Sequence, residues 1–229
     1  SFTLPHGLQV KMLKSKILYA KLSSFRPPFV ARPWSPYHKE LSQSKALVID
    51  LRDNPGGDFG NALTLMGPLL CKTTFVGAMI NPRSIEKREA DYPYRLPWSQ
   101  QIDWLNSHYR LDFKTPESEF CYKKPLVVLV NEYSASNSEM FASAILELKR
   151  GKVFGQITSG SVLVGVWHRL DELGTGYTLS IPQALILSRN GKFLEGKGVV
   201  PQEYFDYTRS DFERGEDTWV RKASEALIR

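Results

Sequence analysis

The chain has 229 residues, of which 42% are hydrophobic and 24% are charged, and its net charge is +6. That composition is typical of a soluble globular protein, whose core can form in one domain with or without an appendage. The longest apolar runs, such as Leu126 to Val130, are far too short to span a bilayer, so we expect no membrane span. The basic residues are scattered and accompany no nucleic-acid motif, so we expect a solvated basic surface and no nucleic-acid partner.

The first half of the chain alternates strands and turns before its first long helix. Partial alternation predicts a strand at Ile17 to Phe25, which Arg26-Pro27-Pro28 ends. Ala46 to Leu51 is a compact apolar run that predicts a buried strand. The sequence Asn54-Pro55-Gly56-Gly57 then predicts a tight turn, because proline fixes φ and glycine permits a positive φ. A helix is expected to follow at Phe59 to Cys71.

The next segment, residues 82–124, is rich in charged and aromatic residues. We interpret it as an insertion that contains a helix at Ser99 to His108. A β-branched strand at Leu126 to Val130 leads into a helix at Ser138 to Lys149, whose apolar residues fall on or near one face. Further elements are expected as strands at 152–154, 166–170, 177–181 and 184–188 and a helix at 219–228. Alternating strands, turns and helices predict an α/β fold.

The two cysteines, Cys71 and Cys121, match no metal-binding or redox motif. They could pair as a disulfide or remain as thiols. We favour two buried thiols, because unpaired cysteine is among the most buried residue types. No motif implies a metal or another cofactor, so we expect neither.

Two segments in which a strand runs through a turn into a helix carry residues suited to catalysis. Serines lie at the start of the helix expected after Val130, where free backbone N–H groups can stabilise an oxyanion. Serine is also a favoured N-cap, so Ser134, Ser136 and Ser138 are equally well explained as helix caps. In the other segment, Gly56-Gly57 can expose N–H groups to a ligand or simply form a tight turn.

Five motifs, in the same order along the chain, resemble those of one peptidase family. The family includes the C-terminal processing (tail-specific) proteases, the tricorn core and a protease-like activity factor secreted by some intracellular bacteria, and the resemblance covers nearly the whole chain. The motifs are Lys16 to Phe25 (family pattern I-G-Y-x-x-I-x-x-F), Ala46 to Gly57 (L-I-I-D-L-R-x-N-P-G-G), Leu126 to Glu139 (V-V-L-V-N-x-x-S-A-S-A-S-E), Gly155 to Gly160 (G-x-x-T-x-G) and Leu194 to Gln202 (E-G-x-G-V-x-P-D).

Carried over by position, the resemblance makes Ser136 the catalytic nucleophile. It places the oxyanion hole at the backbone N–H of Asn137 and at an N–H of the Gly56-Gly57 turn. In the processing branch of the family the general base is a lysine, but Ser161 stands at that position here. A serine–lysine pair therefore cannot form at this place.

The tricorn-like branch uses histidine as the base, with a glutamate shortly before the G-V-x-P motif. Glu195 stands at that place, so the chain is closer to this branch, and its carboxylate could stabilise an imidazolium or be a surface group beside a turn. The histidines that match no family motif are His6, His38, His108 and His168. Either the base lies on an N-terminal segment that this sequence lacks, or another residue serves, or the site is inactive.

The resemblance implies a ClpP/crotonase-like superhelix of ββα units, with residues 1–15 as a lead-in too short for a PDZ domain and residues 16–229 as the catalytic core. It implies a serine endopeptidase that forms an acyl-enzyme with an extended protein or peptide substrate and is periplasmic or secreted. The alternative is a catalytically inactive member that binds peptides or apolar ligands, as the retinoid-binding repeats of the interphotoreceptor retinoid-binding protein do. The sequence does not determine the oligomeric state.

Overall fold

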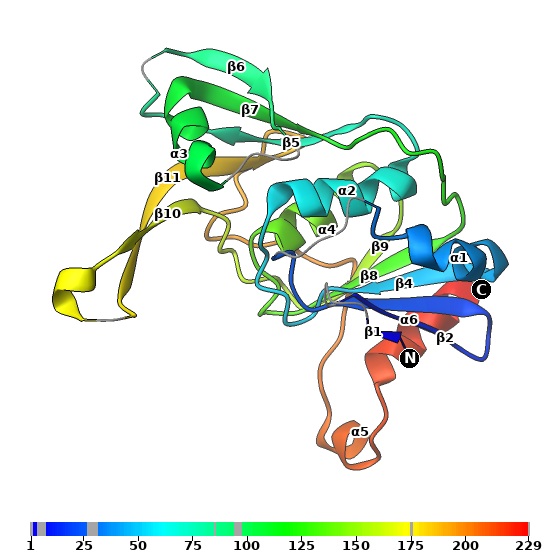
Figure 1. Cartoon of the computed structure of the whole chain (residues 1–229). Coiled ribbons are helices and arrows are strands. Elements are labelled where there is room, and N and C mark those ends of the chain that lie inside the picture. Colours follow the sequence, from blue (N-terminus) through cyan, green and yellow to red (C-terminus); the bar gives the residue numbers. More distant parts are fainter. Residues whose placement is uncertain are drawn as a thin grey trace.

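The computed structural model describes residues 2–3, 8–26, 32–84, 86–93, 98–174 and 176–228. They form two β-sheets against which helices pack (Figure 1). This mixture confirms the α/β class expected from the sequence. His6, one of the candidate bases, lies outside the described residues.

The first sheet has seven strands in the order β1-β2-β3-β4-β8-β9-β12. From β3 onward neighbouring strands are parallel, whereas β1 and β2 are antiparallel to their neighbours. The strands are β1 (Phe2–Thr3), β2 (Leu8–Met12), β3 (Ile17–Leu22), β4 (Ala46–Asp50), β8 (Leu126–Val130), β9 (Lys152–Gly155) and β12 (Glu203–Tyr204). The expected lead-in thus supplies β2 to the sheet, and β4 and β8 lie side by side with their carboxyl ends at one edge.

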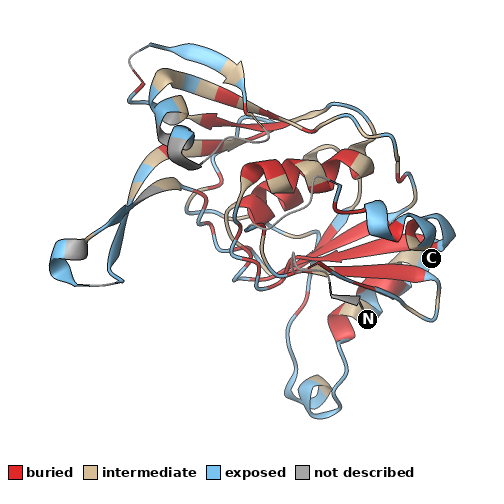
Figure 2. Ribbon diagram, viewed as in Figure 1, coloured by how far each residue is buried: buried red, intermediate tan, exposed pale blue. Residues whose placement is uncertain are grey.

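Helices cover both faces of this sheet (Figure 1). Successive residues of a strand point to opposite faces. Leu47 of β4 accordingly belongs to the core beneath α2 and α4, and Val48 to the core beneath α6. Figure 2 shows the central strands β4 and β8 buried along their length. The helices are α2 (Phe59–Leu70), α4 (Asn137–Glu147) and α6 (Thr218–Ile228).

The second sheet has five strands in the order β10-β11-β5-β7-β6 and lies above α2 in Figure 1, where its apolar residues join the same core as α2 and α4. Its elements are β5 (Phe75–Ile80), β6 (Arg88–Asp91), α3 (Trp98–Ser107), β7 (His108–Lys114), β10 (Val164–Arg169) and β11 (Thr178–Ser188). Residues 82–124 therefore supply β6, α3 and β7, and the interpretation of this segment as an insertion remains a prediction. The short helices are η1 (Ser35–Tyr37), α1 (His38–Gln43), η2 (Asp171–Leu173) and α5 (Arg209–Glu213).

One expected break in the second sheet is wrong. The strands predicted at 177–181 and 184–188 form the single strand β11, although Pro182 lies within it. Pro182 is opposite Gly165, where the register of β10 and β11 shifts. Proline is tolerated in a strand where an irregularity leaves its missing N–H unneeded.

The interpretation of the cysteines as free thiols is also wrong. Cys71 and Cys121 form a disulfide whose two Cα atoms are 4.7 Å apart. Cys71 caps the end of α2, and the segment that carries Cys121 folds back on that helix, where the Tyr122 N–H donates to the Pro68 carbonyl over 2.8 Å. The pairing depends on this tertiary contact between positions 50 residues apart, which no local pattern reveals.

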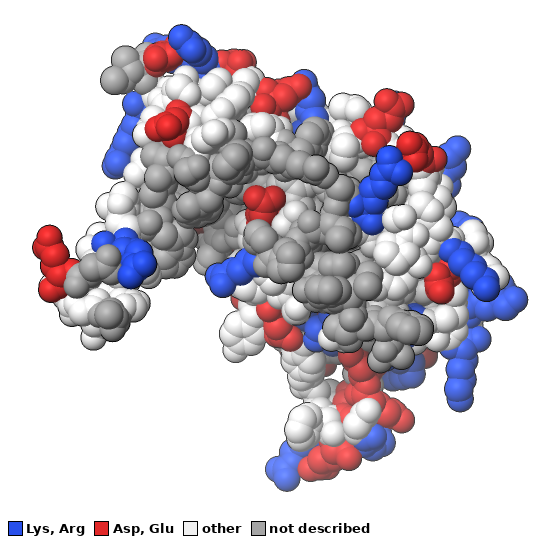
Figure 3. Space-filling view, in the orientation of Figure 1, with Lys and Arg blue, Asp and Glu red and all other residues white. Residues whose placement is uncertain are grey.

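Among the described residues, no helix is long and apolar enough to cross a membrane. On the face shown in Figure 3, Lys and Arg side chains lie among Asp and Glu side chains instead of forming one basic patch. The described part of the chain also contains no cluster of His, Cys, Asp or Glu that could hold a metal ion.

Candidate active site

The structure separates the three serines that the sequence alone could not rank. The hydroxyl of Ser134 donates to the Leu51 carbonyl over 2.8 Å, and that of Ser138 donates to the Asn54 carbonyl over 2.9 Å. Both serines are fully buried and join the start of α4 to the turn after β4. Ser136 is half-buried, and its hydroxyl donates no hydrogen bond to any residue that the structure describes.

Ser136 is also the N-cap of α4, where its N–H donates to the Glu139 side chain while its own side chain makes no capping hydrogen bond. Its backbone departs from an ordinary cap, with φ of 56° and ψ of −116°. Such a conformation is strained for a residue other than glycine and persists only where the surroundings enforce it. Here the Ser136 N–H is held by the Ser161 carbonyl at 2.9 Å and by Oε2 of Glu139 at 3.0 Å.

The diglycine turn lies directly against this serine. A Cβ atom added to Gly56 would stand 2.6 Å from Cβ and 3.0 Å from Oγ of Ser136. A Cβ atom added to Gly57 would stand 2.4 Å from the backbone carbon of Phe25. With φ values of 93° and 147°, both positions need glycine, for conformation and for close approach.

The three backbone N–H groups predicted for the oxyanion hole are not equivalent. The Gly56 N–H donates to Oδ1 of Asn54 over 2.9 Å and is occupied within the turn. Neither the Gly57 N–H nor the Asn137 N–H has an acceptor among the described residues. Each of the two strand–turn–helix segments therefore has one backbone donor without an acceptor among the described residues, directly after Gly56 in one segment and directly after Ser136 in the other.

The buried carboxylate of Glu139 accepts hydrogen bonds from several residues around Ser136, although the sequence analysis did not assign Glu139 to the site. Oε1 accepts from the Thr158 hydroxyl at 2.6 Å and the Gly160 N–H at 2.8 Å, and Oε2 accepts from the N–H groups of Ser136 and Ser161 at 3.0 Å. Burial raises the pKa of Glu139 above its ordinary value, although these hydrogen bonds oppose the shift. The carboxylate joins the Ser136 turn to the loop at 158–161.

Glu195 lies near this loop but has a different partner from the one expected. Its Oε2 accepts a hydrogen bond of 2.7 Å from the Val162 N–H. Ser161, which stands where the processing branch has lysine, shares a hydrogen bond of 2.9 Å with the Ser159 hydroxyl. The contact of Glu195 thus holds the loop beside Ser136, and among the described residues no histidine bonds to this carboxylate.

The described histidines lie on other parts of the fold. His38 is exposed and stacks on Phe120 with ring centroids 4.6 Å apart, and His108 stacks on Trp104 at 4.4 Å. His168 is exposed on β10. Within the described ranges, neither a histidine nor a lysine makes a hydrogen bond to Ser136.

An ion cluster supports the turn from the opposite face of the sheet. Arg52 donates to both carboxylate oxygens of Asp50 and to both of Asp217, with its shortest contact to each at 2.6 Å. Tyr19 donates to Asp50 over 2.5 Å, and burial, with the adjacent Asp50 charge, raises the pKa of Tyr19. Although burial opposes it, Arg52 holds the pKa of Asp217 below its ordinary value. The cluster ties the start of α6 to the segment that leads into the diglycine turn.

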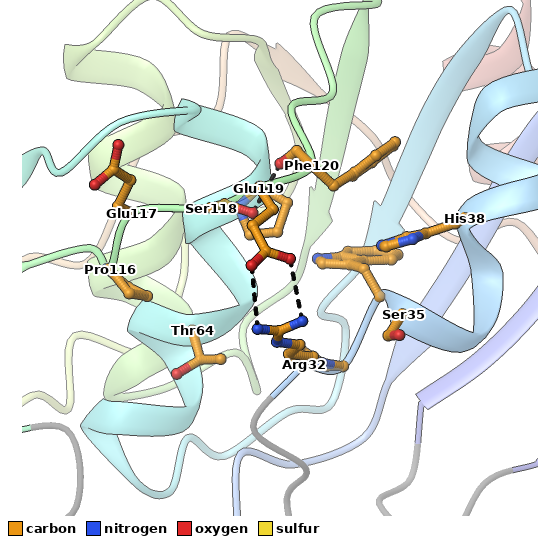
Figure 4. A pocket seen from close by; sticks show the side chains of 12 residues that line it. Arg32, Ser35, His38, Thr64, Pro116, Glu117, Ser118, Glu119 and Phe120 are labelled. Carbon is orange, nitrogen blue, oxygen red and sulfur yellow. Dashed lines mark hydrogen bonds and ion pairs between the residues drawn. The ribbon is translucent and has the colours of Figure 1, made fainter.

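A surface pocket of about 180 Å³ lies apart from these residues, between η1, α2 and the loop after β7 (Figure 4). Arg32 and Glu119 form an ion pair of 3.1 Å across it. Its lining residues are Arg32, Pro33, Trp34, Ser35, His38, Thr64, Pro68, Pro116, Glu117, Ser118, Glu119 and Phe120. None of the residues assigned to the nucleophile or the oxyanion hole lines it.

Known proteins resemble the chain over most of its length. It is 26% identical over 183 residues to the carboxy-terminal processing protease CtpA of Bacillus subtilis, covering 79% of this chain and 33% of that protein. It is 27% identical over 162 residues to a probable CtpA-like serine protease of Staphylococcus aureus, covering 71% of this chain and 27% of that protein. The chain therefore spans about a third or less of these relatives.

Solved structures share the fold. A putative peptidase from Parabacteroides merdae matches with a TM-score of 0.74 and 19% identity, over 99% of this chain and 66% of that one. The photosystem II D1 C-terminal processing protease matches with a TM-score of 0.61 and 23% identity, over 83% and 42%. The tricorn protease matches with a TM-score of 0.61 and 21% identity, over 94% and 18%. The last two have the ClpP/crotonase-like core expected from the sequence.

The family model described as peptidase family S41 matches residues 16–205, which is most of the chain. This match shows the family, and the relatives, which include a processing protease and the tricorn protease, do not select a branch. The chain belongs to peptidase family S41.

Proposed function

We propose that this chain is a serine endopeptidase in which Ser136 is the nucleophile. The observation that carries the proposal is the position of the Ser136 hydroxyl against Gly56, where the next residue along each segment, Gly57 and Asn137, has a backbone N–H without an acceptor among the described residues. An oxyanion hole needs such donors fixed beside the nucleophile before the reaction begins. Family membership supports a protein or peptide as the substrate.

In this proposal Ser136 Oγ attacks the carbonyl carbon of the scissile bond and loses its proton to a base. The carbonyl oxygen becomes an oxyanion that accepts hydrogen bonds from the N–H groups of Gly57 and Asn137. Collapse breaks the C–N bond, the amine leaves with a proton, and the acyl group stays on Ser136 until water hydrolyses the ester. The chemistry requires no metal or other cofactor.

The substrate would bind in extended form along a strand edge, where main-chain hydrogen bonds give affinity. β10 is an edge strand of the second sheet and begins at Val164, shortly after Ser161, whose carbonyl holds the Ser136 N–H. An extended peptide paired with this edge would approach the nucleophile directly. Nothing in the composition or the charge pattern supports a nucleic-acid partner.

We further propose that the site belongs to the branch that uses histidine and glutamate. Ser161 at the lysine position argues against the other branch, and Glu195 holds the loop beside Ser136.

The disulfide supports a periplasmic or secreted location, because disulfides persist in oxidising compartments. A lipoprotein from Streptococcus agalactiae shares the fold, with a TM-score of 0.59 and 17% identity over 94% of this chain, and its name agrees with such a location.

The decisive test is labelling with a fluorophosphonate probe, which reacts with an activated serine hydroxyl. The wild-type chain should be labelled, and Ser136→Ala should abolish the labelling. Ser143→Ala is a matched control, because Ser143 is a buried serine two turns further along the same helix, and no hydrogen bond joins it to the turn among the described residues. Labelling that persists in Ser136→Ala would contradict the assignment of the nucleophile.

One observation favours a second function, in which the chain binds a ligand without catalysing hydrolysis. Within the described part of the chain no lysine or histidine contacts Ser136, as expected of an inactive member that binds a peptide or an apolar ligand. This alternative predicts a wild-type chain that binds such a ligand but is not labelled by the probe.

A further inference from the structure

Asn137, the residue after the proposed nucleophile, has a side chain that is completely buried. Its Nδ2 donates to the carbonyl of Gly57 over 2.8 Å. Its Oδ1 is also buried and has no partner among the residues that the structure describes. Because a buried acceptor without a partner is unfavourable, an apolar residue would be better tolerated here unless the contact to Gly57 is needed.

Gly57 is held on both sides by groups from elsewhere in the fold. The preceding carbonyl, that of Gly56, accepts from the Phe25 N–H at 2.9 Å and from the Ser24 hydroxyl at 3.2 Å. The following carbonyl, that of Gly57 itself, accepts from Asn137. Since a trans peptide points its N–H away from its C=O, the Gly57 N–H is directed away from residues 24–25.

These anchors matter because glycine has more backbone freedom than any other residue. Without them the peptide groups around Gly57 could rotate, and the Gly57 N–H would leave the direction in which it can serve an oxyanion. A donor is useful in catalysis only if its orientation is fixed before charge develops.

We propose that the side chain of Asn137 is a positioning group for the oxyanion hole. Its backbone N–H supplies one donor, and its side chain holds Gly57 so that the second donor stays beside the first. This inference rests on the proposed function and adds to it a side chain that nothing in the family patterns assigns, since the motif has alanine at this place.

The expected effect is moderate and confined to the transition state. Removing a direct donor from an oxyanion hole lowers kcat about 10²–10³-fold. Losing only an anchor leaves the donor present but less often in position, so we expect a loss of about tenfold in kcat. KM should change little, because the contact acts on the transition state and not on substrate binding.

The experiment compares Asn137→Ala with Ser143→Ala in the whole chain. A fluorogenic peptide that the wild type cleaves gives kcat and KM. A peptide aldehyde, whose adduct with Ser136 carries an oxyanion, is compared as an inhibitor with a non-covalent product peptide. Asn137→Ala should lose about tenfold in both kcat and aldehyde affinity, with KM and product affinity unchanged. Ser143→Ala should resemble the wild type.

Three results overturn the inference. If the wild type cleaves and Asn137→Ala equals Ser143→Ala in both measurements, the positioning role is wrong and the proposed function stands. If the wild type neither cleaves nor is labelled, both are wrong. If circular dichroism shows that Asn137→Ala does not fold, Ser24→Ala takes its place, because it removes the other side-chain anchor from a half-buried position. Ser24→Ala must then show the same parallel loss in kcat and aldehyde affinity. If it shows no such loss, the positioning role is rejected.

Discussion

Glu139→Gln tests whether one buried carboxylate holds the turn at Ser136, the proposed nucleophile, in its strained conformation. Glutamine has the same shape, but only one of its terminal atoms accepts hydrogen bonds. Whichever way the amide turns, two of the four groups that now donate to Glu139 face an NH₂ group instead. The substitution therefore removes two accepted hydrogen bonds with almost no change in volume.

The size of the effect follows from the kind of bond that is lost. Hydrogen bonds to charged groups contribute about 1.5–3 kcal/mol each, so two of them amount to about 3–6 kcal/mol. Burial of the ionised carboxylate, which raises its pKa, offsets part of this loss. We therefore expect the free energy of unfolding to fall by about 2–4 kcal/mol. Since Ser136 depends on the same contacts for its backbone conformation, kcat should fall about 100-fold or more.

The assay pairs urea unfolding with peptide hydrolysis. Glu147→Gln is the matched control, because Glu147 lies on the same helix and accepts hydrogen bonds from Ser188 and Asn190 away from the site. Its substitution should leave kcat unchanged. Glu139→Gln with wild-type kcat would refute the idea that this carboxylate maintains the nucleophile turn, even if stability fell as predicted.

Gly56→Ala should nearly abolish peptide hydrolysis, because the new Cβ would come within 2.6 Å of Cβ of Ser136 at a φ of 93°. The backbone strain should also lower the free energy of unfolding by about 1–3 kcal/mol. A variant that still hydrolyses peptide would contradict the close approach. Asp217 has a lowered pKa, so its ion pair adds stability above the ordinary pKa of aspartate, and that stability is lost as the pH falls through the lowered value. Because its side chain is 45% exposed, Asp217→Asn should cost only about 1 kcal/mol at pH 7 in urea unfolding. A difference from wild type that does not shrink as the pH falls below the ordinary pKa of aspartate would reject the ion pair as its cause.

The sequence by itself determined the α/β class, the two turns that meet at the candidate site, and the helix that follows each of these turns. Both turns could be recognised because local chemistry specifies them: an apolar run predicts each strand, and glycines or serines predict the turn at its end. Since β4 and β8 are parallel neighbours, their carboxyl ends necessarily bring Gly56 and Ser136 to one edge of the sheet.

Only the tertiary structure decided which of the three serine hydroxyls donates to no described residue, because the partners of Ser134 and Ser138 lie on a distant segment. The same holds for the disulfide and for the ion pair between Arg52 and Asp217, whose partners are 50 and 165 residues apart. Such contacts depend on how complete elements pack together. Residue patterns report the conformation of a segment and the face that it buries, but not which distant side chain will meet it there.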